Sequence, residues 1–204
     1  MKIGIFGGTF DPIHNAHLFV AESARRLEGL DRVLFVPTNT VHYRPAPEAS
    51  AADRCAMIAL AIASNDAFAL DETDVRAGAT GYTADLLPKI AAAYPRARLT
   101  FITGADSIAS GAWNRFEEVL EALDAFVVAP RAGVSAGAVE RAAGTVPIAL
   151  RARVRMLDLP DLPESATLVR TLLSQRKSVR YLVPEPTWRY IVARDLYGLR
   201  HGDA

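Results

Sequence analysis

The sequence predicts an α/β fold, a Rossmann-like parallel sheet with helices on both faces, followed by a small helical segment at the C-terminus. Short apolar runs rich in β-forming residues alternate along the chain with segments of helical periodicity. The first strand, helix and second strand fit within about thirty-five residues, which is the spacing of a parallel βαβ unit. In such sheets ligands bind beyond the carboxyl ends of the strands, so we expect a site beside Gly7, Pro37 and Gly104.

The first repeat of strand and helix lies in the N-terminal quarter. Residues 2–6 are an apolar run that a glycine pair ends at once, and residues 32–36 are a second such run. Between them, from Asn15 onward, apolar residues recur at helical spacing. The residues on one face of this expected helix are Leu18, Ala21, Ala24 and Leu27. Residues 37–52 have the proline and alanine content of a loop.

The alternation continues through the rest of the chain. Further helices are expected at 53–64, 83–94 and 114–123, and further strands at 68–75, 98–103, 125–129 and 151–159. In the helix at 53–64 we expect Met57, Leu60 and Ala61 to face inward, and Thr83 is the expected cap of the next helix. Residues 131–150 indicate a surface helix and a connector. The remainder from Glu164 is expected to be helical, with a break at 181–184. We expect one domain, with residues 1–160 as its core and 161–204 as a helical subdomain.

Composition limits the class of protein. The 204 residues, half of them hydrophobic, are enough for one sizeable core and short for two full domains. The 23 basic and 23 acidic residues balance, which argues against broad electrostatic binding to nucleic acid. The single cysteine, Cys55, excludes an internal disulfide. No apolar stretch approaches the length of a membrane span, and a strand beginning at Lys2 leaves no room for a signal peptide, so we expect a cytoplasmic protein.

The most informative stretch is GGTFDPIHNAH, residues 7–17. A glycine turn follows a strand, and His14 and His17 stand where a helix starts. A helix N-terminus offers free N–H groups and a positive partial charge, which suit a phosphate. One alternative is that both histidines merely decorate the helix. Another is a zinc site with Cys55, but paired cysteines and an evident third ligand nearby are missing.

This stretch resembles the GxFxPxHxxH signature of the nucleotidyltransferases, which are related to the class I aminoacyl-tRNA synthetases. The resemblance implies that His14 and His17 hold the triphosphate of ATP during attack on its α-phosphorus. It also implies an ATP site that includes the residues around the glycine turn, namely Gly7, Gly8, Thr9 and Phe10.

A second stretch, Glu164-Ser-Ala-Thr-Leu-Val-Arg170, resembles the ISSTxxR signature of the same superfamily. The resemblance implies that Ser165, Thr167 and Arg170 grip the β- and γ-phosphates of ATP. Ala166 departs from the pattern, because a second hydroxyl usually stands there. The alternative for this stretch is a capped amphipathic helix with a solvated arginine.

Further matches narrow the resemblance to the bacterial nicotinate mononucleotide adenylyltransferases. The matching segments are Phe35-Val-Pro37 with His42, Gly81-Tyr-Thr83, Ile102-Thr-Gly-Ala-Asp-Ser107, Trp113 and Tyr181-Leu-Val-Pro184. The family's roles would then fall on the backbone of Tyr82 and Thr83 for the pyridine carboxylate, Trp113 for stacking on the pyridine ring, and Gly104 and Asp106 for a ribose hydroxyl. His42 and Arg44 would add basic groups near the acceptor.

Each of these residues also has a plainer interpretation. Asp106 could be a helix cap, Trp113 core packing, and His42 and Arg44 loop surface. The stretch Thr40–Arg44 replaces the family's PPHK-like run, and the turn before Trp113 is short for the family.

The resemblance implies transfer of an adenylyl group from ATP to nicotinate mononucleotide, with Mg²⁺ bound through the ATP phosphates and no dedicated metal site in the protein. The expected partners are these two nucleotides, without nucleic acid or membrane, and homo-oligomerisation stays open. The alternatives are an enzyme of the superfamily with phosphopantetheine or nicotinamide mononucleotide as acceptor, a non-catalytic nucleotide sensor, and an interaction module that kept only the fold.

Overall fold

A computed structural model describes residues 1–38, 45–111, 113–131 and 133–199. Its centre is a parallel sheet of six strands in the order β3-β2-β1-β4-β5-β6. The strands are β1 (Lys2–Gly8), β2 (Arg32–Pro37), β3 (Phe68–Leu70), β4 (Arg98–Gly104), β5 (Ala125–Ala129) and β6 (Val154–Met156). This order confirms the predicted Rossmann-like fold, with its switch point between β1 and β4.

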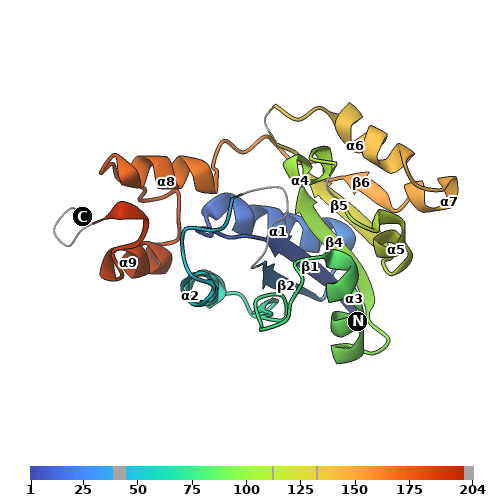
Figure 1. Cartoon of the computed structure of the whole chain (residues 1–204), viewed down its shortest axis with the longest axis horizontal. Helices are drawn as coiled ribbons and strands as arrows, with labels where there is room; N and C mark the ends of the chain where they lie inside the picture. Colours follow the sequence, from blue (N-terminus) through green and yellow to red (C-terminus); the bar gives the residue numbers. More distant parts are fainter. Residues whose placement is uncertain (39–44, 112, 132, 200–204) are drawn as a thin grey trace.

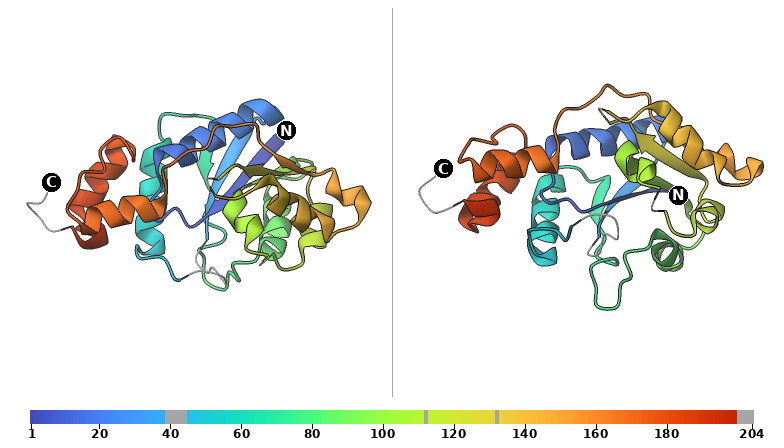
Figure 2. Two further views of the ribbon diagram at one scale, coloured as in Figure 1. Left: turned by 90° about the horizontal axis from the view of Figure 1, so that it is seen from above. Right: turned by 45° about the horizontal axis from the view of Figure 1, so that its top comes forward.

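Helices cover both faces of the sheet (Figures 1 and 2). The described helices are α1 (Asn15–Glu28), α2 (Ala51–Ile62), α3 (Thr83–Ala93), α4 (Ala105–Ala109), α5 (Phe116–Glu121), α6 (Ala136–Gly144), α7 (Ile148–Arg151), α8 (Ala166–Ser174), α9 (Glu185–Ala193) and the 3₁₀ helix η1 (Leu196–Gly198). Because successive strand residues point to opposite faces, Phe6 packs into the core under α1 and α2, and its neighbour Ile5 packs into the core under α3 and α5. Strands β1 to β5 therefore contribute to two separate cores, whereas the apolar residues of β6 pack only against the second.

The buried face of α1 agrees with the sequence prediction at Ala21 and Ala24 and differs from it at Leu18 and Leu27. Its buried residues are Ala16, Val20, Ala21 and Ala24. Leu18 is only partly buried, and Leu27 is 57% exposed. Large sheet side chains such as Phe6 and Phe35 fill this layer, so the helix contributes mainly alanines and lies close to the strands.

The inward face of α2 was also predicted wrongly in part. Met57 is buried as expected, but Leu60 is 39% exposed, and Arg54 takes a fully buried position. The Arg54 guanidinium Nη1 donates to the carbonyl oxygens of Thr9 and Thr38, both at 2.7 Å. A buried charge satisfied by distant backbone oxygens is not visible in an apolar pattern, so the periodicity misplaced this face.

Several element boundaries also differ from the prediction. β3 ends at Leu70, β6 covers only three residues, and α5 is shorter than 114–123. Thr83 is the first residue of α3, and the capping position belongs to Tyr82. The short helix α4 was not expected as an element. The predicted break in the C-terminal helices is confirmed, because α8 ends at Ser174 and α9 begins at Glu185.

The C-terminal helices pack on one side of the domain, beside α2 (Figure 1). The hydroxyl of Tyr190 on α9 donates to Asp53 Oδ1 on α2 at 2.9 Å. The turn before α9 reaches α1, because the Asn15 backbone N–H donates to the Leu182 carbonyl at 2.9 Å and its side-chain Nδ2 donates to the Tyr181 carbonyl at 2.6 Å. The C-terminal segment is therefore fastened at the start of the first helix.

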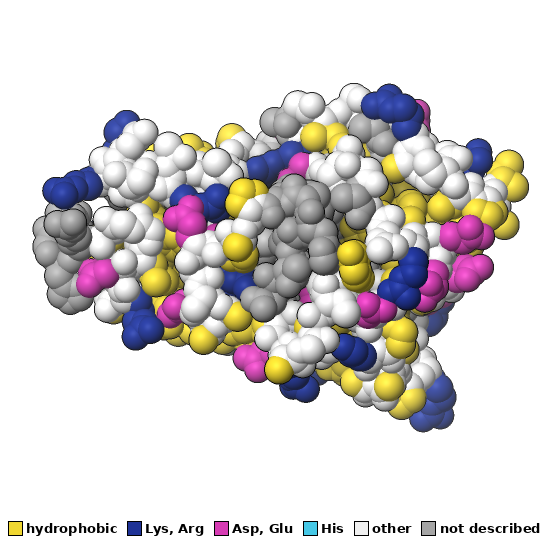
Figure 3. All heavy atoms as spheres, viewed as in Figure 1, with side chains coloured by type: hydrophobic (Ala, Val, Ile, Leu, Met, Phe, Trp, Pro, Cys, Tyr) yellow, Lys and Arg dark blue, Asp and Glu magenta, His cyan; other side chains and the backbone are white. Residues whose placement is uncertain are grey.

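On the face shown in Figure 3, Lys and Arg side chains are scattered among acidic and uncharged ones and do not form a continuous basic patch. Within the described ranges, no helix combines the length and the apolar character that a membrane crossing requires.

The aromatic cluster around Phe126 provides a test of the second core. Its ring stacks on Phe101 at 5.6 Å between centroids and meets Trp113 edge-on at 4.9 Å, and the side chain is fully buried. We expect Phe126→Ala to lower the free energy of unfolding by about 3–5 kcal/mol in urea titrations, because it removes a buried ring and leaves a cavity. The control Phe19→Ala, at an exposed position of α1, is expected to cost about 1 kcal/mol or less. Equal losses in both variants would contradict this assignment of the core.

Candidate active site

A cavity of about 660 Å³ opens at the carboxyl ends of β1 and β4, at the switch in strand order. The predicted site residues that line it are Gly7, Gly8, Thr9, Phe10, His14, His17, Tyr82, Thr83, Gly104, Asp106, Trp113, Ser165, Thr167 and Arg170. His42 and Arg44 lie outside the described residues. The two motifs from opposite ends of the chain therefore face one another across a single cavity.

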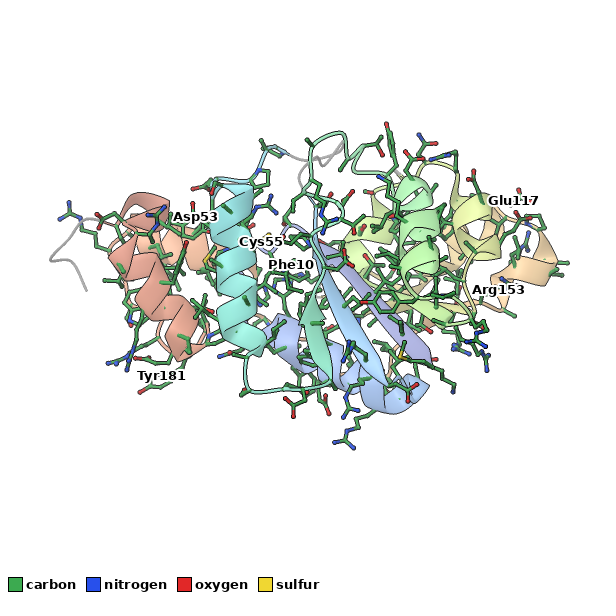
Figure 4. The ribbon with its side chains drawn as sticks, turned by 90° about the horizontal axis from the view of Figure 1, so that it is seen from below. Phe10, Asp53, Cys55, Glu117, Arg153 and Tyr181 are labelled. Carbon is green, nitrogen blue, oxygen red and sulfur yellow. The ribbon has the colours of Figure 1, made fainter. Side chains whose placement is uncertain are left out.

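The glycine pair at the end of β1 allows close packing at the cavity floor. A Cβ atom on Gly7 would lie 2.8 Å from the Phe101 ring, and one on Gly8 would lie 3.2 Å from the Phe10 ring. Phe10 itself has a left-handed backbone, with φ of 49°, and its side chain is buried. Figure 4 shows its position between α2 and the sheet. The Phe10 ring packs edge-on against the His17 ring, with 5.0 Å between ring centroids, and so restricts the orientation of that imidazole.

His14 and His17 stand at the N-terminus of α1, as predicted. His14 is the capping residue, and the two imidazole rings stack with centroids 3.6 Å apart. The backbone N–H of His14 donates to His17 Nδ1 at 3.2 Å. A neutral imidazole has one donor and one acceptor nitrogen, so this contact places the proton of His17 on Nε2. His17 therefore offers a single N–H donor on a ring that lines the cavity.

Both histidines are neutral at physiological pH in this structure. Burial, and after it the nearby charge of Arg131, lower the pKa of His14 to about 3. The pKa of His17 is also well below its ordinary value, because of burial first and then of His14 and Arg131. Among the described residues that line the cavity, positive charge therefore comes from arginines, and the imidazoles act as hydrogen-bond donors.

Arg131 is a cavity residue that the sequence analysis missed. It follows β5 directly, and its Nη1 donates to the carbonyl of Glu164 at 2.9 Å, just before α8. In such sheets ligands bind at the strand ends, and from the sequence a site was expected only at the ends of β1, β2 and β4. The arginine was assigned instead to a surface connector.

The N-terminus of α8 forms another wall of the cavity. Ser165 is its capping residue, and Ser165 Oγ accepts the backbone N–H of Leu168 at 3.0 Å. The capped-helix interpretation of this stretch is thus correct in its first half. Its second half, a solvated arginine, is wrong, because Arg170 is partly buried and makes directed contacts.

The guanidinium of Arg170 is held at two points. Its Nη1 donates to the backbone carbonyl of Asp11 at 2.7 Å, and its Nε donates to Glu48 Oε1 at 2.7 Å. Asp11 is 3% exposed, and its carboxylate accepts the backbone N–H groups of Glu48 at 2.8 Å and Ala49 at 3.0 Å. Asp11 and Glu48 thus connect the N-terminal motif with Arg170 of the C-terminal motif.

The opposite end of the cavity is lined by Tyr82, Thr83 and Trp113. The ring of Trp113 packs edge-on against Phe101 and Phe126, as its plainer interpretation predicts, and it also lines the cavity, where stacking on a pyridine ring stays a prediction. Its Nε1 donates to the Ser107 carbonyl at 3.2 Å, which fixes the indole plane. The indole is therefore pre-oriented as one wall of the cavity.

Gly104 and Asp106 lie between these two ends. Gly104 is the capping residue of α4, and Asp106 is the second residue of that helix, so Asp106 does not occupy the capping position. A Cβ atom on Gly104 would lie 2.6 Å from Asp106 Oδ1. Glycine is therefore what allows the Asp106 carboxylate to fold back over the end of β4.

Asp74 is a second cavity residue that the sequence analysis missed. It is buried beside the turn that contains Gly81, and burial raises the pKa of its carboxyl, while hydrogen bonds from Thr38 and the Gly81 amide oppose this rise. The carboxylate thus connects the end of β2 with the loop before α3. Outside the undescribed segments, no group of three or more His, Cys, Asp or Glu residues is arranged to hold a metal ion.

The buried histidines make stability depend on pH. Their pKa is lowered on folding, to about 3 for His14 against 6.5 for an ordinary histidine, so the unfolded chain binds more protons between these values. The contribution of the neutral histidines to the free energy of unfolding is therefore fully present above pH 6.5. It is lost as the pH falls toward the pKa of the folded protein. We expect His14→Asn to flatten the dependence of the free energy of unfolding on pH, by about 1.4 kcal/mol per pH unit below the ordinary histidine pKa, in urea titrations at several pH values. An unchanged slope would show that His14 is protonated in the folded protein.

Known proteins resemble this chain along nearly all of its length. The model of the cytidylyltransferase-like family matches residues 5–172. The "Probable nicotinate-nucleotide adenylyltransferase" of Symbiobacterium thermophilum is 36% identical, and the match covers 99% of each chain. The protein of the same name from Corynebacterium glutamicum is 38% identical over 96% of this chain and 88% of its own.

A solved structure shares the fold. It is the Plasmodium falciparum nicotinic acid mononucleotide adenylyltransferase complexed with NaAD, which superposes with a TM-score of 0.75 at 21% identity and covers 98% of both chains. At that identity the superposition shows the fold alone, and the sequence relatives identify the family. This chain therefore belongs to the nicotinate-nucleotide adenylyltransferases, within the cytidylyltransferase-like family.

Proposed function

We propose that this protein transfers the adenylyl group of ATP to nicotinate mononucleotide and releases pyrophosphate and deamido-NAD. The observation that carries the proposal is the cavity itself, whose lining includes His14, His17 and Arg170 at one end and Tyr82 and Trp113 at the other. Relatives that share more than a third of their residues with this chain are named for the same activity.

The two ends of the cavity suit the two substrates. Imidazole N–H groups, a guanidinium and the start of α8 are all suited to phosphate oxygens, and we assign them to the triphosphate of ATP. The Tyr82 backbone N–H donates to Thr80 Oγ1 at 3.3 Å, but α3 begins at Thr83, and the first N–H groups of a helix have no partner within it and suit a carboxylate. The indole of Trp113 provides a flat surface for a pyridine ring. We therefore assign this end to nicotinate mononucleotide.

The reaction needs little acid–base chemistry from the protein. An oxygen of the acceptor phosphate forms a bond to the α-phosphorus of ATP, and the bond from that phosphorus to the bridging oxygen breaks, so the electron pair leaves with pyrophosphate. Because the acceptor is already an anion, catalysis depends on alignment of the two phosphates and on stabilisation of the charge that develops on the leaving oxygens. The His17 Nε2–H, the Arg170 guanidinium and the α8 N-terminus are the groups we assign to this stabilisation.

Mg²⁺ enters this proposal as part of the substrate, bound to the phosphates of ATP and to water. Of the carboxylates that line the cavity, that of Asp11 already accepts the backbone N–H groups of Glu48 and Ala49. When bound with ATP, the ion supplies charge neutralisation to the phosphates.

The choice of acceptor can be tested directly. We expect pyrophosphate release from ATP and Mg²⁺ with nicotinate mononucleotide, and much slower release with nicotinamide mononucleotide or phosphopantetheine, in a coupled pyrophosphate assay. Faster release with phosphopantetheine or with the amide would reassign the acceptor. ATP binding in calorimetry without release for any of the three would identify a nucleotide sensor instead.

The role of His17 gives a second test. We expect His17→Ala to lower kcat by about 10²–10³-fold, because it removes a donor to charge that develops in the transition state. His17→Gln, whose side-chain amide places a donor near the position of Nε2, is expected to retain more of the activity. Thermal unfolding of both variants controls for folding. Turnover of His17→Ala within a few-fold of the unsubstituted protein would remove this residue from the mechanism.

A further inference from the structure

The chain makes a strained turn after α9, before the last described residue. Asp195 and Tyr197 have left-handed backbones, with φ of 51° and 59°, and Gly198 follows with φ of 80°. Only glycine adopts this conformation without steric cost, so two other residues in it indicate that the surrounding structure holds them there. In this turn the side chain of Tyr197 points into the interior, and the residue is 8% exposed.

The Tyr197 hydroxyl reaches the N-terminal motif. It donates to Asp11 Oδ1 at 2.9 Å, across nearly the whole length of the chain. Burial and the charge of Asp11 raise the pKa of Tyr197, so its hydroxyl keeps its proton and remains a donor. Tyr197 completes the set of donors around this buried carboxylate, together with the backbone N–H groups of Glu48 and Ala49.

Through Asp11 this contact extends to the phosphate end of the cavity. Arg170 donates to the Asp11 carbonyl and to Glu48, and its Nη1 lies 3.9 Å from Asp11 Oδ2. The partners of the Arg170 guanidinium are thus Asp11 and Glu48, and the backbone N–H of Glu48 in turn donates to the Asp11 carboxylate. Tyr197 is not among the residues that line the cavity, so it has no direct contact with a ligand bound there.

We infer that Tyr197 is a positioning residue for the phosphate end of the site, acting through Asp11 on Arg170 and on the turn at Glu48–Ala49. The inference rests on the proposed function insofar as ATP is taken as the ligand of that end. Loss of the hydroxyl leaves a buried carboxylate short of one donor, and such a group shifts its neighbours or admits water. The guanidinium then loses its fixed orientation while the fold remains.

The chain offers a matched control in Tyr190. Its hydroxyl also donates to an aspartate, Asp53 Oδ1, at the same distance of 2.9 Å, and it also comes from the C-terminal segment. Figure 4 shows Asp53 on the side of α2 that faces the C-terminal helices. Asp53 pairs with Ser50 and Arg194, and neither Tyr190 nor Asp53 lines the cavity. Tyr190→Phe therefore removes the same chemistry from the same segment without contact to the phosphate end.

The experiment measures ATP affinity by calorimetry with Mg²⁺ and without any acceptor. We expect Tyr197→Phe to raise the Kd for ATP about tenfold and Tyr190→Phe to leave it within about twofold, since only the first removes a donor from a charged acceptor that supports Arg170. In steady-state assays the KM for ATP should rise in Tyr197→Phe, with the KM for nicotinate mononucleotide unchanged. Melting temperatures report folding of both variants, and each phenylalanine retains the buried ring.

A double-mutant cycle separates positioning from a general loosening of the fold. If Tyr197 acts through Arg170, Tyr197→Phe should raise the Kd for ATP no more than about twofold when Arg170→Lys is already present. Equal effects of Tyr197→Phe with and without Arg170→Lys, an unchanged Kd, or the same rise in Tyr190→Phe would each overturn the inference. Because this Kd is measured without an acceptor, the result stands apart from the acceptor assay, in which failure of the proposed function would appear.

Discussion

The buried carboxylate of Asp11 is the group on which the phosphate end of this site depends. A carboxylate away from water requires donors, and these come from the turn at Glu48–Ala49 and from Tyr197 near the C-terminus. Two segments that are distant from Asp11 in the sequence therefore converge on its charge. Arg170, which contacts both Asp11 and Glu48, is placed as a consequence of that convergence. The site is thus built by charge compensation inside the fold as much as by its two recognisable motifs.

Burial also gives the histidines and the arginines of the cavity different electrostatic roles. An imidazole loses its proton readily when it is desolvated, and the pKa values of His14 and His17 show this loss. A guanidinium keeps its charge in the same surroundings, because its intrinsic pKa is far higher. In the described part of the cavity, Arg131 and Arg170 therefore provide the positive charge, and the stacked histidines provide directed N–H groups, with Phe10 packed against His17. This division suits a ligand that is both highly charged and in need of exact alignment.

Prediction from the sequence succeeded where the signal is local. Strand ends marked by Gly7 and Gly104, and a hydroxyl residue capping a helix at Ser165, follow from short-range steric and hydrogen-bonding preferences. It failed where a position is decided by partners far along the chain. The apolar residues of α2 predicted a buried face without Arg54, but its guanidinium is buried because it donates to backbone oxygens of two loops. Arg131 was missed for a similar reason, since its partner carbonyl belongs to a segment beyond the last strand.

By itself the sequence determined the alternating strands and helices, the glycine turn with its two histidines, and the residues of both motifs that line the cavity, because each of these depends on residue types at short spacing. Only the tertiary structure decided which face of each helix is buried, that the imidazoles are neutral, and that Tyr197 supports Asp11. Those outcomes depend on desolvation and on hydrogen bonds between distant segments. Neither exists until the chain has folded and brought these segments together.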